Sequence, residues 1–205
     1  MRVTSLLIAG TLGLAPCAPS VAQTVPPPSG TIYTTPHRET ADGNLQACGV
    51  EFLAVGRDIA TQRGAPVLLS GSVYIRKGKG NSIFYALKLG VRDGIDPKVV
   101  PFAPANAFVS GIDSPAAPVF SKADSDMPGF RLFVGVLDDG FEPFMKSIID
   151  QHKFVVGFNR KPGQMDVSTV IDMDTDTDGR RHQFNPADLS PTMRAFVTCA
   201  VDFLK

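Results

Sequence analysis

The sequence has no excess of either charge. Of its 205 residues, 20 are Lys or Arg and 20 are Asp or Glu, so the formal net charge is zero. Domains that bind nucleic acid usually carry a clustered basic surface, and electrostatic steering of substrates needs an excess of one sign. The charge balance therefore predicts that this protein does not bind nucleic acid.

A long apolar run is also missing. The apolar stretch near the N-terminus, residues 3–14, contains Thr, Ser and Gly and is shorter than the roughly 20 residues that a membrane-spanning helix needs. No later segment is long and apolar enough either. We therefore expect no membrane span.

The familiar catalytic motifs are absent as well. The sequence has no Gly-x-Ser-x-Gly elbow, no His-Glu-x-x-His zinc motif, no Cys-x-x-Cys pair and no phosphate loop ending in Gly-Lys-Ser or Gly-Lys-Thr. We therefore expect a protein that is not an enzyme. The alternative is a small secreted hydrolase that uses His152 or His182 with nearby acids. A pocket that brings either imidazole within hydrogen-bond reach of a Ser or Asp would favour it.

What the sequence does contain begins with the layout of a secretory signal peptide in residues 1–22. Arg2 gives a positive start, the apolar stretch follows, and small residues at Ser20 and Ala22 mark a cleavage site. Cleavage there would remove one basic residue, Arg2, and leave 19 basic against 20 acidic residues, a net charge of −1. We expect the mature protein to be periplasmic or secreted.

The segment Leu14-Ala15-Pro16-Cys17 permits a second interpretation, a lipoprotein signal with a lipid on Cys17. Pro16 stands where that motif has a small Gly, Ala or Ser. We therefore expect no lipid on Cys17. With a lipid, the protein would instead be a tethered structural component of the envelope.

Removal of the signal leaves two cysteines, Cys48 and Cys199. An even pair in an exported protein predicts a disulfide bond. The chain-entropy model gives a loop of this length a stabilisation of about 5 kcal/mol. The alternative, a catalytic thiol, needs a histidine partner and a reducing compartment, and neither is evident.

Residues 23–46 are predicted to be a proline-rich flexible tether. Residues 26–28 are three consecutive prolines, and residues 31–44 are polar without an apolar period. We expect residues 47–205 to form a single α+β domain, because the chain length suggests one domain that is large enough to bury a core.

This domain is predicted to be mostly antiparallel β-sheet, either sandwich-like or a half-barrel. Apolar and more polar residues alternate over residues 67–75 and 83–91, the period of strands with one buried face. The Gly-rich residues 77–81 predict a hairpin turn between them. Further strands are predicted over residues 50–55, 130–137, 154–158 and 165–171, the last two as a hairpin.

Residues 94–129 contain six prolines and are predicted to form a loop that wraps an edge of the sheet and buries Phe102, Phe108 and Phe120. The alternative is a loop with a function of its own.

Two helices are predicted, a short one near residues 143–151 and a C-terminal one near residues 190–204. Ser190 suits the N-cap of the second helix and Pro191 its first position. Its apolar stripe borders Cys199, so a bond to Cys48 would attach this helix to the sheet.

One local motif points to metal chemistry. Asp174, Asp176 and Asp178, followed by a glycine, resemble the first half of an EF-hand-type calcium loop. The resemblance ends there, because Asn185 stands where that loop has its bidentate Glu. The alternative is a hairpin turn at Asp178 and the following glycine, which would join residues 167–172 to a strand near residues 182–184. We expect the turn and no cofactor, with Ca²⁺ at the three acids as the alternative.

These features together predict an exported, non-enzymatic envelope protein. It would bind a small ligand or a partner in the envelope through its sheet or through the proline-rich residues 94–129.

Overall fold

The computed structural model describes residues 29–78, 80, 82–96, 98–139, 141–164, 166–175, 177 and 189–203. The elements follow the order β1 (Gly30–Ala41), β2 (Asn44–Asp58), α1 (Ile59–Gln62), β3 (Ala65–Lys77), β4 (Ile83–Asp93), β5 (Asn106–Ser110), β6 (Ser121–Asp124), β7 (Phe130–Val136), α2 (Glu142–Gln151), β8 (Lys153–Asn159), β9 (Val167–Asp172) and α3 (Pro191–Phe203). The predicted signal peptide, with Cys17, lies outside the described residues.

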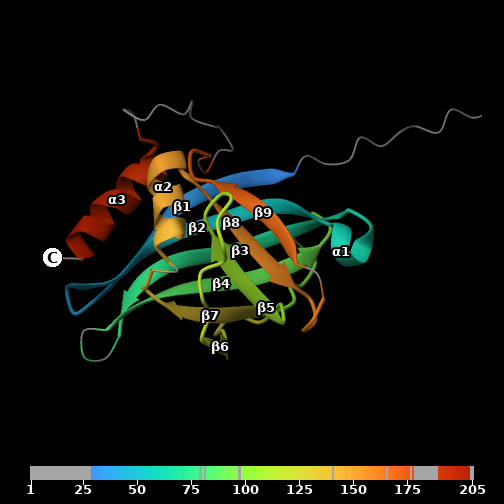
Figure 1. Ribbon diagram of the computed structural model, residues 1–205, viewed down its shortest axis with the longest axis horizontal. Helices are drawn as coiled ribbons and strands as arrows, with labels where there is room; N and C mark the ends of the chain where they lie inside the picture. Colours follow the sequence, from blue (N-terminus) through green and yellow to red (C-terminus); the bar gives the residue numbers. More distant parts are fainter. Residues whose placement is uncertain are drawn as a thin grey trace, which may run out of the picture.

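The strands form two antiparallel sheets. The larger sheet has the order β1-β2-β3-β4-β7-β6, and the smaller one has the order β5-β8-β9. The smaller sheet lies across one face of the larger sheet (Figure 1). The predicted α+β class, dominated by antiparallel strands and closed by a C-terminal helix, is confirmed.

The hydrophobic core fills the space between the sheets. Alternate residues of β3, such as Leu69 and Val73, belong to this core, because successive side chains of a strand point to opposite faces. From β2, Phe52 meets Phe154 of β8 edge to face, with 6.1 Å between the ring centroids. The intervening residues of the same strands face away from the core and form the outer face of the larger sheet.

The predicted tether over residues 23–46 is wrong from residue 30 onward. Residues 30–41 form β1, which pairs with β2 along its length. Polar side chains on both faces of β1 have partners: the His37 imidazole contacts Glu51, and the buried Thr34 hydroxyl donates to the Thr175 carbonyl oxygen. The turn between β1 and β2 has positive φ angles at Asp42 (52°) and Gly43 (75°), the geometry that an Asp-Gly hairpin turn favours. Residues 23–28 lie outside the described residues.

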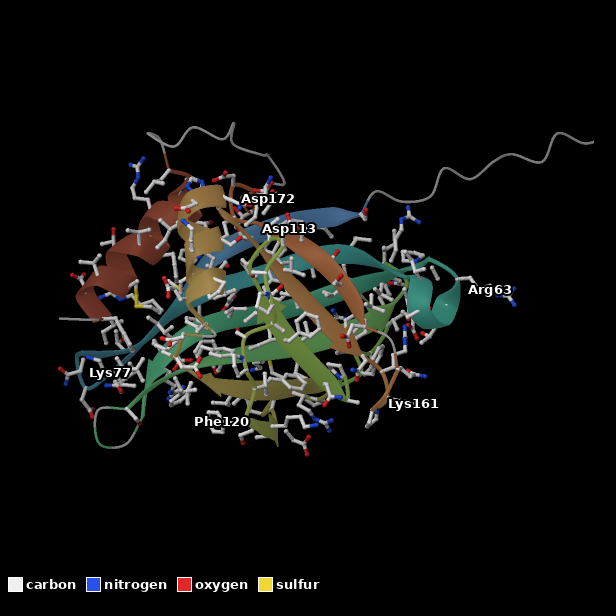
Figure 2. The ribbon with its side chains drawn as sticks, in the orientation of Figure 1. Arg63, Lys77, Asp113, Phe120, Lys161 and Asp172 are labelled. Carbon is white, nitrogen blue, oxygen red and sulfur yellow. A yellow bond between two sulfur atoms is a disulfide. The ribbon has the colours of Figure 1, made fainter. Side chains whose placement is uncertain are left out.

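The loop predicted for residues 94–129 contains two short strands. Strand β5 pairs with β8, and β6 pairs with β7. Phe102 packs against Phe158, with ring centroids 6.5 Å apart. Phe120 is 65% exposed, contrary to the prediction, and lies at the periphery of the molecule (Figure 2). Strands of four and five residues between prolines are too short to show a clear period.

Both predicted helices are present, as α2 and α3. The Ser190 hydroxyl accepts a hydrogen bond from the Met193 backbone N–H at 3.2 Å, so the predicted N-cap is confirmed. The disulfide between Cys48 and Cys199 is also confirmed; it joins β2 to α3 with 5.8 Å between the Cα atoms (Figure 2). No helix among the described residues is both long and apolar enough to span a membrane.

A charged cluster connects the two sheets at the ends of their strands. Arg160, which follows β8, donates from Nε to Asp58 Oδ2 of β2 at 2.7 Å and also contacts Asp93 of β4. The Arg160 guanidinium lies 4.7 Å from the centre of the Phe102 ring. Burial raises the pKa of Asp58, but hydrogen bonds from Thr61 and Arg160 outweigh it and hold that pKa below its ordinary value.

Candidate functional site

A groove of about 400 Å³ lies on the outer face of the larger sheet. One wall comes from β1, β2 and β3, and the other comes from the turn between β6 and β7. The floor is formed by β3. Strand alternation explains this position, because the polar residues of β3 face the groove while the apolar residues between them face the core.

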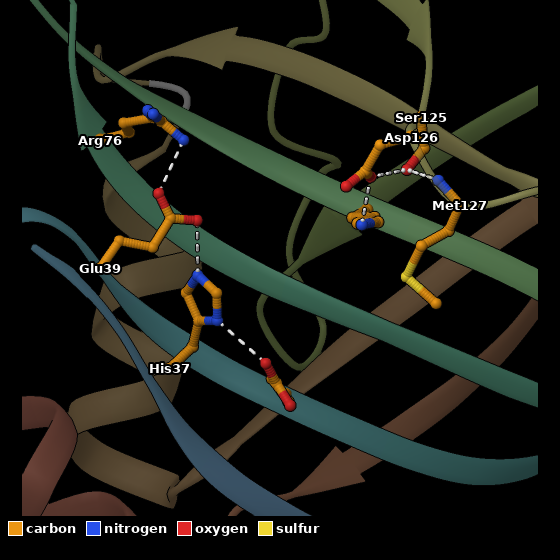
Figure 3. A network of polar contacts seen from close by, with 8 residues as sticks. His37, Glu39, Arg76, Ser125, Asp126 and Met127 are labelled. Carbon is orange, nitrogen blue, oxygen red and sulfur yellow. Dashed lines mark hydrogen bonds and ion pairs between the residues drawn. The ribbon is translucent and has the colours of Figure 1, made fainter. Parts of the chain in front are cut away.

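The first wall is a chain of charged side chains built around His37. Its Nδ1 lies 3.0 Å from Glu51 Oε1, and its Nε2 lies 3.1 Å from Glu39 Oε1. Arg76 donates from Nη1 to the other oxygen of Glu39 at 2.8 Å (Figure 3). Both His37 contacts are hydrogen bonds at once only when the imidazole carries two protons, because neutral imidazole has a single donor.

Gly49 allows the His37 ring to pack against the Tyr74 ring. His37 of β1 pairs with Gly49 of β2, which pairs with Tyr74 of β3. A Cβ atom at Gly49 would lie 2.1 Å from the carbonyl oxygen of Val73 and 2.4 Å from Tyr74 Cβ. Since no side chain stands between them, the His37 and Tyr74 rings meet at 5.1 Å between centroids. Burial and the Glu39 carboxylate raise the pKa of the Tyr74 hydroxyl.

The second wall is ordered by a lysine from β4. Lys88 Nζ donates to Asp126 Oδ1 at 2.8 Å, and the same oxygen accepts from the Ser125 hydroxyl at 2.8 Å. The Ser125 oxygen accepts from the Met127 backbone N–H at 3.1 Å, which closes the turn (Figure 3). The hydrogen bond from Lys88 lowers the pKa of the exposed Asp126 carboxyl.

The floor presents two hydroxyls, from Ser70 and Ser72 of β3. Ser72 is only 7% exposed. Within the described part of the chain, no protein group forms a hydrogen bond with the Ser72 hydroxyl. The Ser72 oxygen is not among the buried unpartnered atoms of the described residues, so it is open to the groove and available to hydrogen-bond a bound molecule.

Of the three predicted metal ligands, the structure describes Asp174 alone. Its side chain is 4% exposed, and its two oxygens lie 3.0 and 3.2 Å from His152 Nδ1. Asp176 and Asp178 lie outside the described residues, as do Asn185 and the predicted turn after Asp178. Among the described residues, no group of three or more His, Cys, Asp or Glu side chains could hold a metal ion. The calcium site therefore stays a prediction.

The pair formed by His152 and Asp174 meets the distance criterion of the hydrolase alternative but is buried. The His152 side chain is 3% exposed. Its backbone carbonyl accepts from the Met173 N–H at 2.9 Å, and the Met173 carbonyl accepts from the Ser190 hydroxyl at 2.9 Å. The pair thus joins the end of α2 to the loop after β9 and to the start of α3. His182 lies outside the described residues.

Sequence reasoning missed the groove although it recognised part of its floor. The polar face of residues 67–75 was visible as alternation, but His37 and Glu39 fell in the predicted tether. The Asp42-Gly43 turn signal could have placed them on a strand. Comparison of the chain with family models, with curated proteins and with solved structures finds no match.

Proposed function

We propose that this chain is an exported, non-enzymatic binding protein that holds a small polar ligand in the outer groove. The observation that carries the proposal is Ser72, a residue only 7% exposed on the groove floor whose hydroxyl is open to the groove and has no protein partner among the described residues. Ligand sites typically combine a concave surface with a few convergent polar groups, and the groove volume of about 400 Å³ falls in their range.

The side chains of both groove walls are held in place by contacts within the protein, which supports ligand binding. His37 contacts a carboxylate on each side, and a hydrogen bond holds the Ser125–Met127 turn before any ligand arrives. A site whose side chains are already held in place loses less conformational entropy when it binds. A hydrolase is less well supported, since His37 faces two carboxylates and His152 is buried.

Export is part of the same proposal. The Cys48–Cys199 disulfide supports an oxidising compartment, and the layout of residues 1–22 supports a cleaved secretory signal. The mass of the intact exported protein tests this. We expect an N-terminus at or near Gln23, whereas a retained signal or an acyl chain on Cys17 would contradict the cleaved soluble form.

A thermal-melt screen tests ligand binding. The panel contains amino acids, polyamines, neutral sugars, nucleosides and dicarboxylates, each at millimolar concentration. We expect one class to raise the melting temperature of the wild-type protein by about 5–10 °C at a hundredfold excess over Kd. The Ser72→Leu variant, which places a bulky side chain on the groove floor, should lose this response.

Ser168→Leu is the matched control, because Ser168 is an exposed serine on β9 of the smaller sheet. It should retain the response of the wild-type protein. If Ser72→Leu does not fold, Ser70→Leu replaces it as the groove-filling variant. The proposal is wrong if no class raises the melting temperature, or if the filled groove responds as strongly as the open one.

A further inference from the structure

We infer that the ligand of this groove is a neutral polyol, a sugar or sugar alcohol that carries hydroxyls at several points of its carbon frame. The inference rests on the proposed function and deepens it by assigning the class of ligand. It follows from the compensated charges of the groove, from a row of polar side chains across its floor, and from the exposure of its apolar side chains.

Each acid that lines the groove already contacts a basic side chain of the protein. The pairs are Glu39 with Arg76, Glu51 with His37, Asp124 with Arg131 and Asp126 with Lys88. When His37 carries the two protons that its two hydrogen bonds require, the four positive charges balance the four negative ones. An ionic ligand would have to displace one of these partners or bring a charge without a counter-charge, whereas a neutral ligand leaves every pair in place.

The strand register puts three polar side chains in one row across the floor of the groove. Glu51 of β2 pairs with Ser72 of β3, and Ser72 pairs with Lys88 of β4. Because neighbouring strands lie about 4.8 Å apart, the row extends over roughly 10 Å from β2 to β4. The row therefore presents a carboxylate, a hydroxyl and an ammonium group in sequence, within reach of one small molecule.

Every member of this row keeps capacity for further hydrogen bonds. Glu51 uses Oε1 on His37, so its Oε2 accepts no hydrogen bond from the described residues. Lys88 donates one of its three ammonium protons, to Asp126, within the described part of the chain. The Ser72 hydroxyl can both donate and accept. Hydroxyl groups of a ligand match all three, because a hydroxyl also donates and accepts, and its hydrogen bonds to the two charged members are the stronger kind.

The apolar side chains of the groove favour an aliphatic frame over an aromatic one. Tyr74, which packs against His37, is 8% exposed, and Phe130 is 7% exposed. These two rings therefore offer little surface on which an aromatic ligand could stack. Met127, in contrast, is 46% exposed and lines the groove. Its unbranched, adaptable side chain suits contact with the C–H groups of a polyol.

Calorimetric titration with neutral polyols tests the inference. The probes are glucose, galactose, mannose, maltose and ribitol, each titrated in EDTA so that no metal ion takes part. Parallel arms use citrate, spermidine, glutamine and adenosine. We expect at least one of the polyols to bind the wild-type protein with one site. Its Kd should stay constant between about 0.05 and 0.5 M salt, because salt screens interactions between charges and the ligand has none.

Two variants remove hydrogen-bonding groups of the row. Ser72→Ala should weaken polyol binding about threefold to tenfold, and Glu51→Ala about tenfold, because a hydrogen bond to a charged group is the stronger one. Ser168→Ala, at an exposed serine of β9, is the control for the lost hydroxyl. Asp113→Asn, at an exposed acid outside the groove, is the control for the lost charge. Both controls should bind as the wild-type protein does, and equal losses in them would overturn the inference.

The remaining outcomes separate the inference from the proposed function. If none of the five polyols binds, the inference is wrong. The binding function still stands in that case if another probe binds with dependence on Ser72. Polyol binding that weakens as salt is raised, or that is unchanged in both Ser72→Ala and Glu51→Ala, would also overturn the inference. If no probe and no compound of the melt screen binds, both proposals fail.

Discussion

Two histidines in this molecule face carboxylates, and their surroundings are opposite. His152 and Asp174 are buried, with side-chain exposures of 3% and 4%, and the backbone around them is bonded to α3 and to the loop after β9. His37 borders an open groove, and its partner Glu51 is 55% exposed. The same residue types thus hold elements together in one place and leave carboxylate oxygens open to solvent in the other. The difference is burial.

The disulfide, like the His152–Asp174 pair, is a buried contact that joins elements. Its removal should give the largest loss in the free energy of unfolding. Cys48→Ala combined with Cys199→Ala should lower the free energy of unfolding by about 5 kcal/mol, because the bond closes a loop across 151 positions. Urea denaturation measures the loss. The remaining folded protein should keep its groove, which the larger sheet and the turn between β6 and β7 form without this bond.

Thiol counting on the denatured, non-reduced wild-type protein is the control. We expect no reaction at Cys48 or Cys199. Reaction at both would show that the bond does not form, and a role for a reactive thiol would then have to be considered.

Removing the carboxylate partner of each histidine tests the comparison directly. Asp174→Ala should lower the free energy of unfolding by about 3 kcal/mol, because it removes the buried carboxylate that contacts the buried His152 imidazole. Glu51→Ala should lower it by less than about 1 kcal/mol, because the contact of Glu51 with His37 is exposed to solvent. Urea unfolding of both variants provides the two values. Equal losses would contradict the view that burial separates the two sites.

Acid stability contrasts a second buried carboxylate, Asp58, with an exposed one, and the expected loss at Asp58 is smaller than that at Asp174. Asp58 has a folded-state pKa below its ordinary value of 3.8. Its contribution to stability is therefore complete above the unfolded-state pKa and is lost as the pH falls through the lower folded-state pKa. Asp58→Asn should cost about 2 kcal/mol at neutral pH. It should also flatten the acid limb of the stability profile.

Asp126 is the exposed counterpart. The hydrogen bond from Lys88 also lowers its pKa, but solvent screens that contact. Asp126→Asn should therefore leave the profile of unfolding free energy between about pH 2 and pH 7 unchanged in shape. A variant profile that flattens as much as that of Asp58→Asn would show that the ion pair at the groove contributes to folding as well.

The sequence by itself determined the elements whose signal is local. Alternation in β3 and β4 is visible because each strand has one apolar face. The N-cap at Ser190 and the stripe of α3 follow from helix geometry, and the Cys48–Cys199 bond follows from the cysteine count. Each of these inferences depends either on residues that are close together in the sequence or on the number of cysteines.

Only the tertiary structure decided β1 and the groove. Strand β1 has polar residues on both faces, so pairing with β2 rather than its own pattern makes it a strand. The groove unites His37, Ser72 and Asp126 through the order and register of the strands of the larger sheet. A period of two tells which side a residue faces but not which strand lies beside it. That choice is made by the packing of the two sheets, because register is specified where one face is buried.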